Sequence, residues 1–564
     1  MRFPVQWVRV GEVGLRVEGT IVAIDLAGNT SPGVPFAGVT PELPPDYRFE
    51  NGCAATPPSA WAALLIAALL LSRRRAALVA LAILGGCSSA EAPPTTGLPF
   101  VFERPAKGEP LTATEVDAFT GELNALWHEA KYFEWAADVS HGVDASTGKP
   151  DYLLWWHDVE VVKAGDTVTF RHSNTGGGHN IYIPSSHVLG AAAAGYLFTG
   201  DAAMGRLAAQ YAKGIDAACR GFVFDANDTN THLMARNVVG SNHGYSLADG
   251  RKAAVDYTPW FTAYQEWNAQ RFQYANNPDW GDVWVTNMRS KDDVPHIYMA
   301  ALILERLAID APDAAIKAAA QKGLDCVHGF TKDIVDSGYV IRTKDPAGQA
   351  YTPTEDLASF VQYESIDPKG ECAAKLTSAL LGTDDPRGND CGRNAITGYE
   401  SYAVALHFYN YHIVQTFHLT AALASLTRGQ NDAAQTLLAG VAERATRYLT
   451  PGAELGQEDE RWGAEISFWL VQAAAVGLPL TAEEVRFVHT NYRRALVAHR
   501  AWGRWNIWEQ PDGTYSPDGG FLPSSRDGLI PAEDLGVFMH YCWSPYRNAS
   551  GQPLVDCEKI RAAW

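Results

Sequence analysis

The chain has few cysteines, few basic residues and none of the common nucleotide-binding motifs. Its 564 residues include 45 Lys and Arg against 64 Asp and Glu, which gives a net charge of −19. This charge disfavours nonspecific binding to nucleic acid, and Lys/Arg-rich runs are absent apart from residues 73–75. No P-loop, dinucleotide fingerprint, Gly-x-Ser-x-Gly elbow or kinase motif set follows residue 87. We therefore exclude nucleic-acid partners, nucleotide-dependent chemistry and the common serine esterases.

Only eight cysteines are present, and none belongs to a Cys-x-x-Cys pair. A zinc site is therefore not expected. Six cysteines follow residue 87, and an even number in an exported chain favours disulfides. Of the possible pairings, proximity in sequence favours Cys372–Cys391 and Cys542–Cys557, which leaves Cys219–Cys326. No cofactor is expected; calcium near Asp225 is a weak candidate, because the loop lacks the glycine and the terminal glutamate of an EF-hand.

The longest apolar stretch, residues 60–86, is interrupted by three arginines at 73–75. A membrane helix needs about 20 apolar residues, and each arginine at its centre costs about 2.5–3.5 kcal/mol on insertion scales. A single span is therefore not expected. Residues 73–86 instead have the charged, apolar and small-residue regions of a signal peptide. The alternative is a buried core helix that ends in Gly-Gly-Cys.

Residues 84–87, LGGC, resemble the lipobox of bacterial lipoproteins. The resemblance implies lipidation of Cys87, an anchor in the cell envelope at the outer membrane or the periplasmic face, and a flexible tether over 87–110. Residues 53–75 resemble the C-terminal sorting signal of myxobacterial surface proteins. Residues 1–52 form a β-rich fragment that is too short for an immunoglobulin-like sandwich of about 100 residues. Our hypothesis is that 1–75 is the tail of a neighbouring gene product.

From residue 111 to residue 564 the pattern is mainly helical. An amphipathic helix is predicted at Thr114–Val139, and a small β-hairpin is predicted near 152–172. Four helical hairpins follow, each with an apolar face that it cannot bury alone. Their predicted bounds are 186–198 with 202–219, 294–309 with 314–327, 402–426 with 433–449, and 466–476 with 482–499.

Short turns inside the hairpins and long aromatic loops between them suggest an α/α toroid, an architecture that many carbohydrate-active enzymes use. The alternative is a TPR-like solenoid, but the repeats lack a fixed period. We therefore expect a toroid domain over 111–564, with its cleft formed by the long loops.

One of these loops contains the pair Asn242-His243. The pair resembles the Asn-His motif of α/α-toroid polysaccharide lyases, including alginate lyases and the heparinase II/III group. The resemblance implies that Asn242 neutralises a uronate carboxylate and that His243 removes the C5 proton. The reaction would also need a cation, which Arg236 or Arg289 could supply. Its acid could be Tyr298, Tyr264 or Tyr245. The alternative is that residues 242–244 only close the C-terminus of a helix.

Carboxylates elsewhere support glycoside hydrolysis as an alternative reaction. Asp292 and Asp293 precede the helix that begins at Val294, where a carboxylate acts either as a cap or as a general acid. Aromatic and polar loop residues are candidates for sugar binding, although a core role is the alternative for most tryptophans. These candidates are Trp155, Trp156, His179, Asn180, Trp260 and Trp284.

Taken together, these patterns predict an exported, lipid-anchored monomer that acts on a polysaccharide or oligosaccharide. Uronate β-elimination is the first expectation, and glycoside hydrolysis and noncatalytic surface glycan binding are the alternatives. The candidate catalytic residues are Asn242, His243, Tyr298, Arg236 and Asp293.

Overall fold

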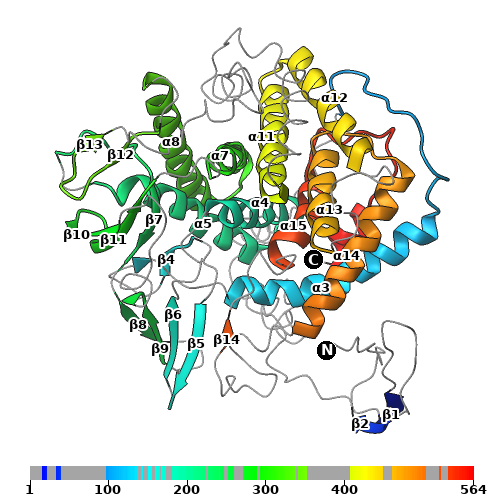
Figure 1. The fold of residues 1–564 in the computed structure, drawn as a ribbon, viewed down its shortest axis with the longest axis horizontal. Helices are drawn as coiled ribbons and strands as arrows, with labels where there is room; N and C mark the ends of the chain where they lie inside the picture. The colour runs from blue at the N-terminus through cyan, green and yellow to red at the C-terminus, as the bar shows by residue number, and fades with distance from the viewer. Residues whose placement is uncertain are drawn as a thin grey trace, which may run out of the picture.

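Figure 1 shows the fold of the protein in a computed structural model. The structure describes residues 16–21, 34–39, 97–136, 142–143, 150–154, 159–165, 167–172, 181–223, 227–240, 242–246, 252–258, 271–288, 293–337, 341–351, 407–448, 460–502, 520–521 and 531–563. Within these ranges no helix is long and apolar enough to span a bilayer. Some predicted positions lie outside the described residues: the 53–87 segment with Cys87, the Cys372–Cys391 pair, Asp225, Trp155, Trp156, His179, Asn180 and Trp260.

The described chain is mainly helical, and all four predicted hairpins are confirmed. They are α4 (Tyr182–Thr199) with α5 (Ala202–Arg220), α7 (Val294–Asp310) with α8 (Ala314–Asp336), α11 (His407–Thr427) with α12 (Asn431–Tyr448), and α13 (Glu460–Ala475) with α14 (Ala482–Trp502). Three further helices are α3 (Ala113–Ala136), α15 (Pro531–Trp543) and α16 (Cys557–Ala563).

Local chemistry explains why the turns inside the hairpins are short. Gly200 ends α4 in the left-handed conformation with φ of 77°, which glycine adopts without steric cost. The Asp201 carboxylate then accepts hydrogen bonds from the backbone N–H groups of Ala203 and Met204, at 2.8 and 3.3 Å, and so caps α5. At the start of α14, Thr481 and Glu484 form a reciprocal capping box.

Five helices form a closed circuit of packing contacts. α4 packs against α7, α7 against α11, α11 against α13, α13 against α15, and α15 against α4. The partners α5, α8, α12 and α14 each pack against one of these helices in its own hairpin, and α3 packs against α15 (Figure 1). The fold therefore brings α3 against α15, although 394 residues of the chain separate the two helices.

Four helices of this circuit have the same sense relative to the cavities that they line. Two adjoining cavities lie inside it, with about 520 Å³ and about 550 Å³ of space not occupied by protein atoms. In α4, α7, α11 and α15 the residue numbers increase from the first cavity to the second; α4, for example, contributes Ser186 to the first and Leu197 to the second. The N-terminal halves of these four helices consequently lie closer to the first cavity than to the second.

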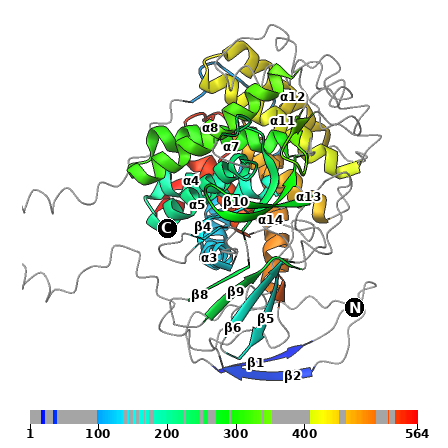
Figure 2. The ribbon, with the colours of Figure 1, turned by 90° about the vertical axis from the view of Figure 1, so that its left-hand side faces the viewer.

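Two small sheets accompany the helices. The first has the order β14-β5-β6-β9-β8 and comprises β14 (Gly520–Phe521), β5 (Val159–Ala164), β6 (Thr167–His172), β9 (Lys252–Asp256) and β8 (His243–Ser246). The antiparallel pair β5–β6 confirms the hairpin predicted near 152–172. The second sheet has the order β10-β11-β7 and comprises β10 (Arg271–Asn277), β11 (Gly281–Asn287) and β7 (Ala235–Val239). Figure 2 shows β5, β6, β8 and β9 projecting from the helical body.

Three two-stranded sheets complete the described secondary structure. They are β1 (Arg16–Ile21) with β2 (Val34–Val39), β3 (Gly142–Val143) with β4 (Pro150–Tyr152), and β12 (Thr343–Lys344) with β13 (Ala350–Tyr351). Each pair is antiparallel.

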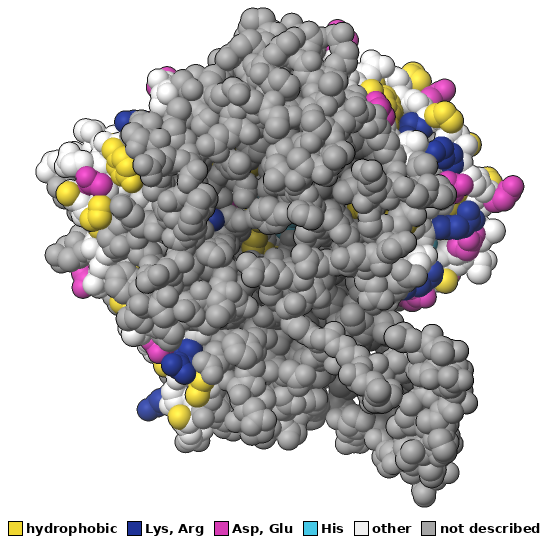
Figure 3. Space-filling model, viewed as in Figure 1, with side chains coloured by type: hydrophobic (Ala, Val, Ile, Leu, Met, Phe, Trp, Pro, Cys, Tyr) yellow, Lys and Arg dark blue, Asp and Glu magenta, His cyan; other side chains and the backbone are white. Residues whose placement is uncertain are grey.

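The segment that precedes α3 is bound to the helical body. The Arg104 guanidinium donates two hydrogen bonds of 2.7 Å to the carboxylate of Glu484, and both side chains are more than 90% buried. On the outer surface nearby, Arg486 pairs with Glu115 at 3.0 Å and Arg493 pairs with Glu122 at 2.6 Å. Figure 3 shows charges of both signs mixed on this flank. The flank is thus not a surface of one sign.

Two of the three predicted disulfides are confirmed. Cys219–Cys326 joins the C-terminal turn of α5 to α8, with the Cα atoms 5.9 Å apart. Cys542–Cys557 joins the end of α15 to the start of α16, with the Cα atoms 5.4 Å apart. Each bridge links neighbouring helices, so both reinforce helix packing.

Candidate functional site

Ionisable and polar side chains are buried together at the N-terminal ends of α4 and α7, next to β7. We call Tyr182, His187, Arg236, Asp293 and His296 the polar core cluster. Each of these residues is less than 9% exposed. Buried charges are expensive unless they are paired, so such a group is more informative about function than an exposed one.

Arg236 and Asp293 form the centre of this cluster. The Nε atom of Arg236 lies 3.7 Å from Oδ2 of Asp293, and their side chains are 8% and 0% exposed. Both were predicted as catalytic candidates from different loops, and the fold brings them together. Asp293 precedes α7, but its carboxylate makes no capping hydrogen bond, so capping is the wrong explanation for this residue. The carboxylate instead compensates the guanidinium charge in a region without solvent.

Histidines from two helices complete the cluster. The rings of His187 on α4 and His296 on α7 are 5.1 Å apart between centroids, in an edge-to-face arrangement. The His187 ring also lies 4.8 Å from the ring of Phe468 on α13. His418 on α11 and Ser467 on α13 are also buried. Histidine is suited to proton transfer near neutral pH, so paired rings here are a candidate acid–base centre.

Tyr182 connects the cluster to the sheet. Its hydroxyl donates a hydrogen bond of 2.5 Å to the carbonyl oxygen of Ala235 in β7. Burial raises the pKa of Tyr182 well above its usual value, and the negative charge of Asp293 raises it further. The phenol therefore stays protonated at any physiological pH and remains a proton donor.

Tyr298 lies on α7 but on another face of the helix. Its side chain is fully buried. Two residues correspond to about 200° of rotation in an α-helix, so Tyr298 lies nearly opposite His296. The structure does not place these two candidates on one face of α7.

Asn242 and His243 belong to the five-stranded sheet rather than to the polar core cluster. The Asn242 amide donates to Asp256 Oδ1 at 3.1 Å and to Thr258 Oγ1 at 2.8 Å, and its oxygen accepts from the Tyr257 N–H at 2.8 Å. These bonds fasten residue 242 to the end of β9. His243 is half-buried in β8, 6.4 Å from the Tyr257 ring. The alternative that these residues close a helix is wrong, because they begin a strand.

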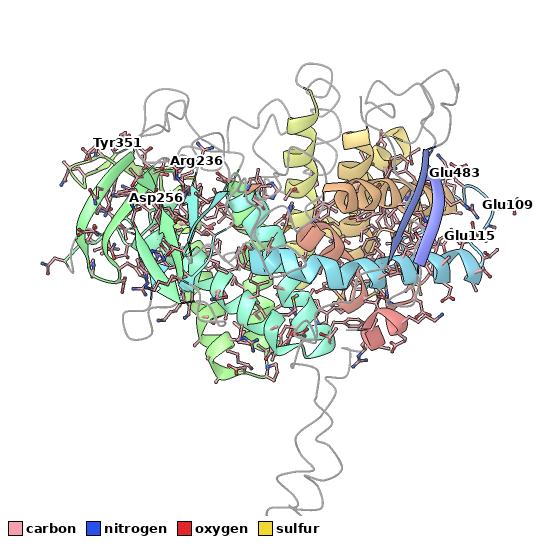
Figure 4. The ribbon with its side chains drawn as sticks, turned by 90° about the horizontal axis from the view of Figure 1, so that it is seen from below. Glu109, Glu115, Arg236, Asp256, Tyr351 and Glu483 are labelled. Carbon is pink, nitrogen blue, oxygen red and sulfur yellow. A yellow bond between two sulfur atoms is a disulfide. The ribbon has the colours of Figure 1, made fainter. Side chains whose placement is uncertain are left out.

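Figure 4 labels one of the candidates, Arg236. It lies at the end of the molecule that carries the strands, together with Asp256 and Tyr351, whereas Glu109, Glu115 and Glu483 lie at the opposite end. Trp284, predicted for substrate binding, is half-buried in β11, which pairs with the strand that carries Arg236. Arg236 and Trp284 therefore belong to one sheet.

Asp228, close in sequence to the weak calcium candidate Asp225, lies next to the charged side chain of Lys344. The buried ammonium group of Lys344 forms an ion pair with Asp228 and donates a hydrogen bond of 2.5 Å to the carbonyl oxygen of Phe222. Among the described residues, no group of three or more His, Cys, Asp or Glu side chains is arranged to hold a metal ion. Lys344 balances the charge of Asp228 from within the fold.

No sequence motif points to Tyr182 or His296, and their role in the cluster depends on the fold. The available signal was their position near the start of two predicted hairpins: Tyr182 lies just before residue 186, and His296 follows residue 294. Comparison of the chain with protein-family models, with curated proteins and with solved structures found no match.

Proposed function

We propose that this protein is a carbohydrate-active enzyme of the α/α-toroid type that cleaves uronate-containing polysaccharide by β-elimination. The closed circuit of α4, α7, α11, α13 and α15, with partner helices outside it, supports the toroid. In this proposal the polar core cluster is the reaction centre, at the end of the toroid to which the long loops lead.

The observation that carries the proposal is the buried Arg236–Asp293 pair beside two histidines and a protonated tyrosine. β-Elimination requires three groups: a cation that lowers the charge of the uronate carboxylate, a base that removes the C5 proton, and an acid for the leaving oxygen. Arg236 would supply the cation, with Asp293 fixing its position. His187 or His296 would be the base. Tyr182 would be the acid, after its hydroxyl turns from the carbonyl oxygen of Ala235 to the leaving oxygen.

The direction of the helices favours an anionic substrate at this end. Each helix N-terminus carries a partial positive charge equivalent to about half a unit. α4 and α7 both begin beside the cluster, so their dipoles add to the charge of Arg236. This local field would let a chain with a net charge of −19 accept a polyanion.

Glycoside hydrolysis is supported less well. That reaction usually needs two carboxyl groups about 5–9.5 Å apart. Among the described residues that are buried, the carboxylates are Asp293 and Glu484, and Glu484 is held by Arg104 beside the N-terminal segment. One carboxylate with two histidines matches proton abstraction better than a two-carboxylate mechanism.

The test is the ultraviolet absorbance of unsaturated uronates after incubation with alginate, pectin and heparan-type glycans. We expect absorbance to rise with one of them, and His296→Gln and Arg236→Met to abolish the rise. His243→Ala is the matched comparison, because it probes the other candidate base. Loss of activity only in His243→Ala would refute the polar core cluster as the centre. Release of reducing ends without the absorbance would identify a hydrolase, and binding without product would identify a glycan-binding protein.

We also propose that the protein is exported and anchored through lipid on Cys87. The lipobox-like residues 84–87 support this, together with the polar, proline-containing sequence that follows Cys87. Intact mass of the native protein from its source cells is the test. A mature chain that retains residues 1–52 would refute the proposal.

A further inference from the structure

One face of the sheet β10-β11-β7 is polar, although most of it is buried. In the register of this sheet Thr286 pairs with Asn237, and Gln273 pairs with Trp284. Because side chains alternate along a strand, these four residues share one face with buried Val239, which pairs with Trp284. The other face carries Tyr274, Val283, Val285 and Val238, which pack in an apolar cluster. The sheet therefore separates an apolar cluster from a face that carries three polar side chains, Trp284 and Val239.

Asn237 has no polar partner within the part of the chain that the structure describes. Its side chain is 0% exposed, and neither Nδ2 nor Oδ1 makes a hydrogen bond there. The Thr286 hydroxyl opposite it is also fully buried without a hydrogen bond among these residues. Buried polar groups are nearly always paired, so two facing exceptions indicate a partner that the described part of the chain does not provide.

Asn277, in the same sheet, shows how a buried asparagine is normally hydrogen-bonded. Its side chain is 3% exposed, and its Nδ2 donates to the carbonyl oxygens of Arg220 and Val223 at 2.8 and 3.3 Å. Its oxygen accepts from the N–H groups of Asp279 and Trp280. An asparagine that only supports this fold is thus fully bonded, which Asn237 is not.

The sheet register also connects Asn237 to the polar core cluster. Thr286 pairs with Asn237, whereas the next residue, Asn287, pairs with Ala235, so Arg236 is the extra residue of a bulge. Bulges of this kind re-aim side chains next to functional sites. The bulge places the ion-paired Arg236 and the unbonded amide of Asn237 side by side in the chain.

We propose that Asn237, Thr286 and Trp284 form a subsite for one neutral sugar unit beside the polar core cluster. An amide offers a donor and an acceptor, and a hydroxyl offers both, which matches the vicinal hydroxyls of a pyranose ring. The half-buried Trp284 supplies an apolar surface for the C–H face of the ring. The subsite lacks a formal charge, so it recognises hydroxyl groups rather than the carboxylate. Its place beside the reaction centre depends on the proposed function, but its binding chemistry does not.

The experiment measures binding separately from cleavage. The probes are carboxyl-reduced tetragalacturonate and carboxyl-reduced tetramannuronate, which are neutral and cannot undergo elimination. Titration calorimetry with the full chain gives Kd, and thermal unfolding gives Tm. Asn237→Leu and Thr286→Val should each weaken binding of one probe about tenfold, the effect of losing one to two hydrogen bonds. Trp284→Ala should weaken it at least as much.

Thermal stability provides the matched control. Asn237→Leu should leave Tm unchanged or raise it, because the amide has no bond to lose, whereas Asn277→Leu should lower Tm. The subsite is refuted if neither probe binds, if Asn237→Leu leaves Kd unchanged, or if it lowers Tm as much as Asn277→Leu. Uronate elimination that persists with unchanged Kd in all three variants would refute the subsite alone. Probe binding without any elimination would retain the subsite and refute the proposed reaction.

Discussion

Gly214→Ala tests how closely α5 approaches β4 and the residues that follow it. A Cβ atom at position 214 would lie 1.8 Å from the carbonyl oxygen of Leu153 and 2.8 Å from its carbonyl carbon. Both are backbone atoms, so no side chain can rotate away. The strand is also fixed to the helix, because the Leu153 N–H donates to the carbonyl oxygen of Gln210 at 3.1 Å. An alanine therefore requires the two backbones to separate by more than 1 Å.

The expected change is a net loss of stability. Overpacking of a dense core costs about 1–3 kcal/mol, and a backbone clash belongs at the upper end of that range. Replacing glycine inside a helix returns about 0.5–1 kcal/mol. We expect Gly214→Ala to lower the free energy of unfolding by about 2 kcal/mol. Gly121→Ala on α3 is the control: a Cβ there meets nothing within 4 Å, so this variant should gain about 0.5–1 kcal/mol.

Guanidinium unfolding followed by far-ultraviolet circular dichroism measures the difference. The midpoints of the two variants should move in opposite directions with equal m-values. If Gly214→Ala is as stable as Gly121→Ala, the close packing of α5 against Leu153 is wrong.

Three other predictions concern pH, disulfides and the segment before α3. Burial lowers the pKa of His489 from 6.5 to about 4, so its neutral form stabilises the fold above pH 6.5, and this contribution is lost as pH falls toward 4. In His489→Gln the free energy of unfolding should therefore change less with pH over that window. Cys219→Ala should lower the free energy of unfolding by about 4–5 kcal/mol and Cys542→Ala by about 3 kcal/mol in thermal melts. The reason is that the first disulfide closes a loop with a sequence separation of 107 and the second a loop with a separation of 15. Equal losses would contradict this dependence on loop length. Arg104→Met should lower the free energy of unfolding by about 3–5 kcal/mol, because it leaves the carboxylate of Glu484 buried without its cation. The double variant with Glu484→Met should recover most of that loss in chemical denaturation.

The helices were predictable because their signals are local. Apolar periodicity and polar turn residues predicted the four hairpins, and the structure differs mainly at their ends. The prediction for α13, for example, began at Ile466, whereas the helix begins at Glu460. The preceding turn is polar and lacks the apolar spacing from which a helix is inferred. Such ends depend on tertiary packing more than on residue preference.

The candidate site was predictable only in part. Arg236 and Asp293 were proposed from separate loops, and the sequence contained nothing that paired them. Asn242 was proposed from a motif, but its amide is bonded to the end of β9. Asn237 was not proposed, because its importance depends on a strand register and a bulge that leave no pattern in the sequence. A motif reports residue types, whereas bonding and burial depend on neighbours distant in the chain.

The sequence by itself determined the helical class, the hairpin pairs, and two disulfides between cysteines 15 and 107 residues apart. These follow from periodicity and turn chemistry over short distances, and from elimination among few cysteines. Only the tertiary structure decided that α3 packs against α15 and that α15 closes the circuit back to α4. It also decided that Arg236 meets Asp293 beside two histidines. Burying the apolar faces of separate hairpins against one another is a property of the whole chain, and the buried cluster is its consequence.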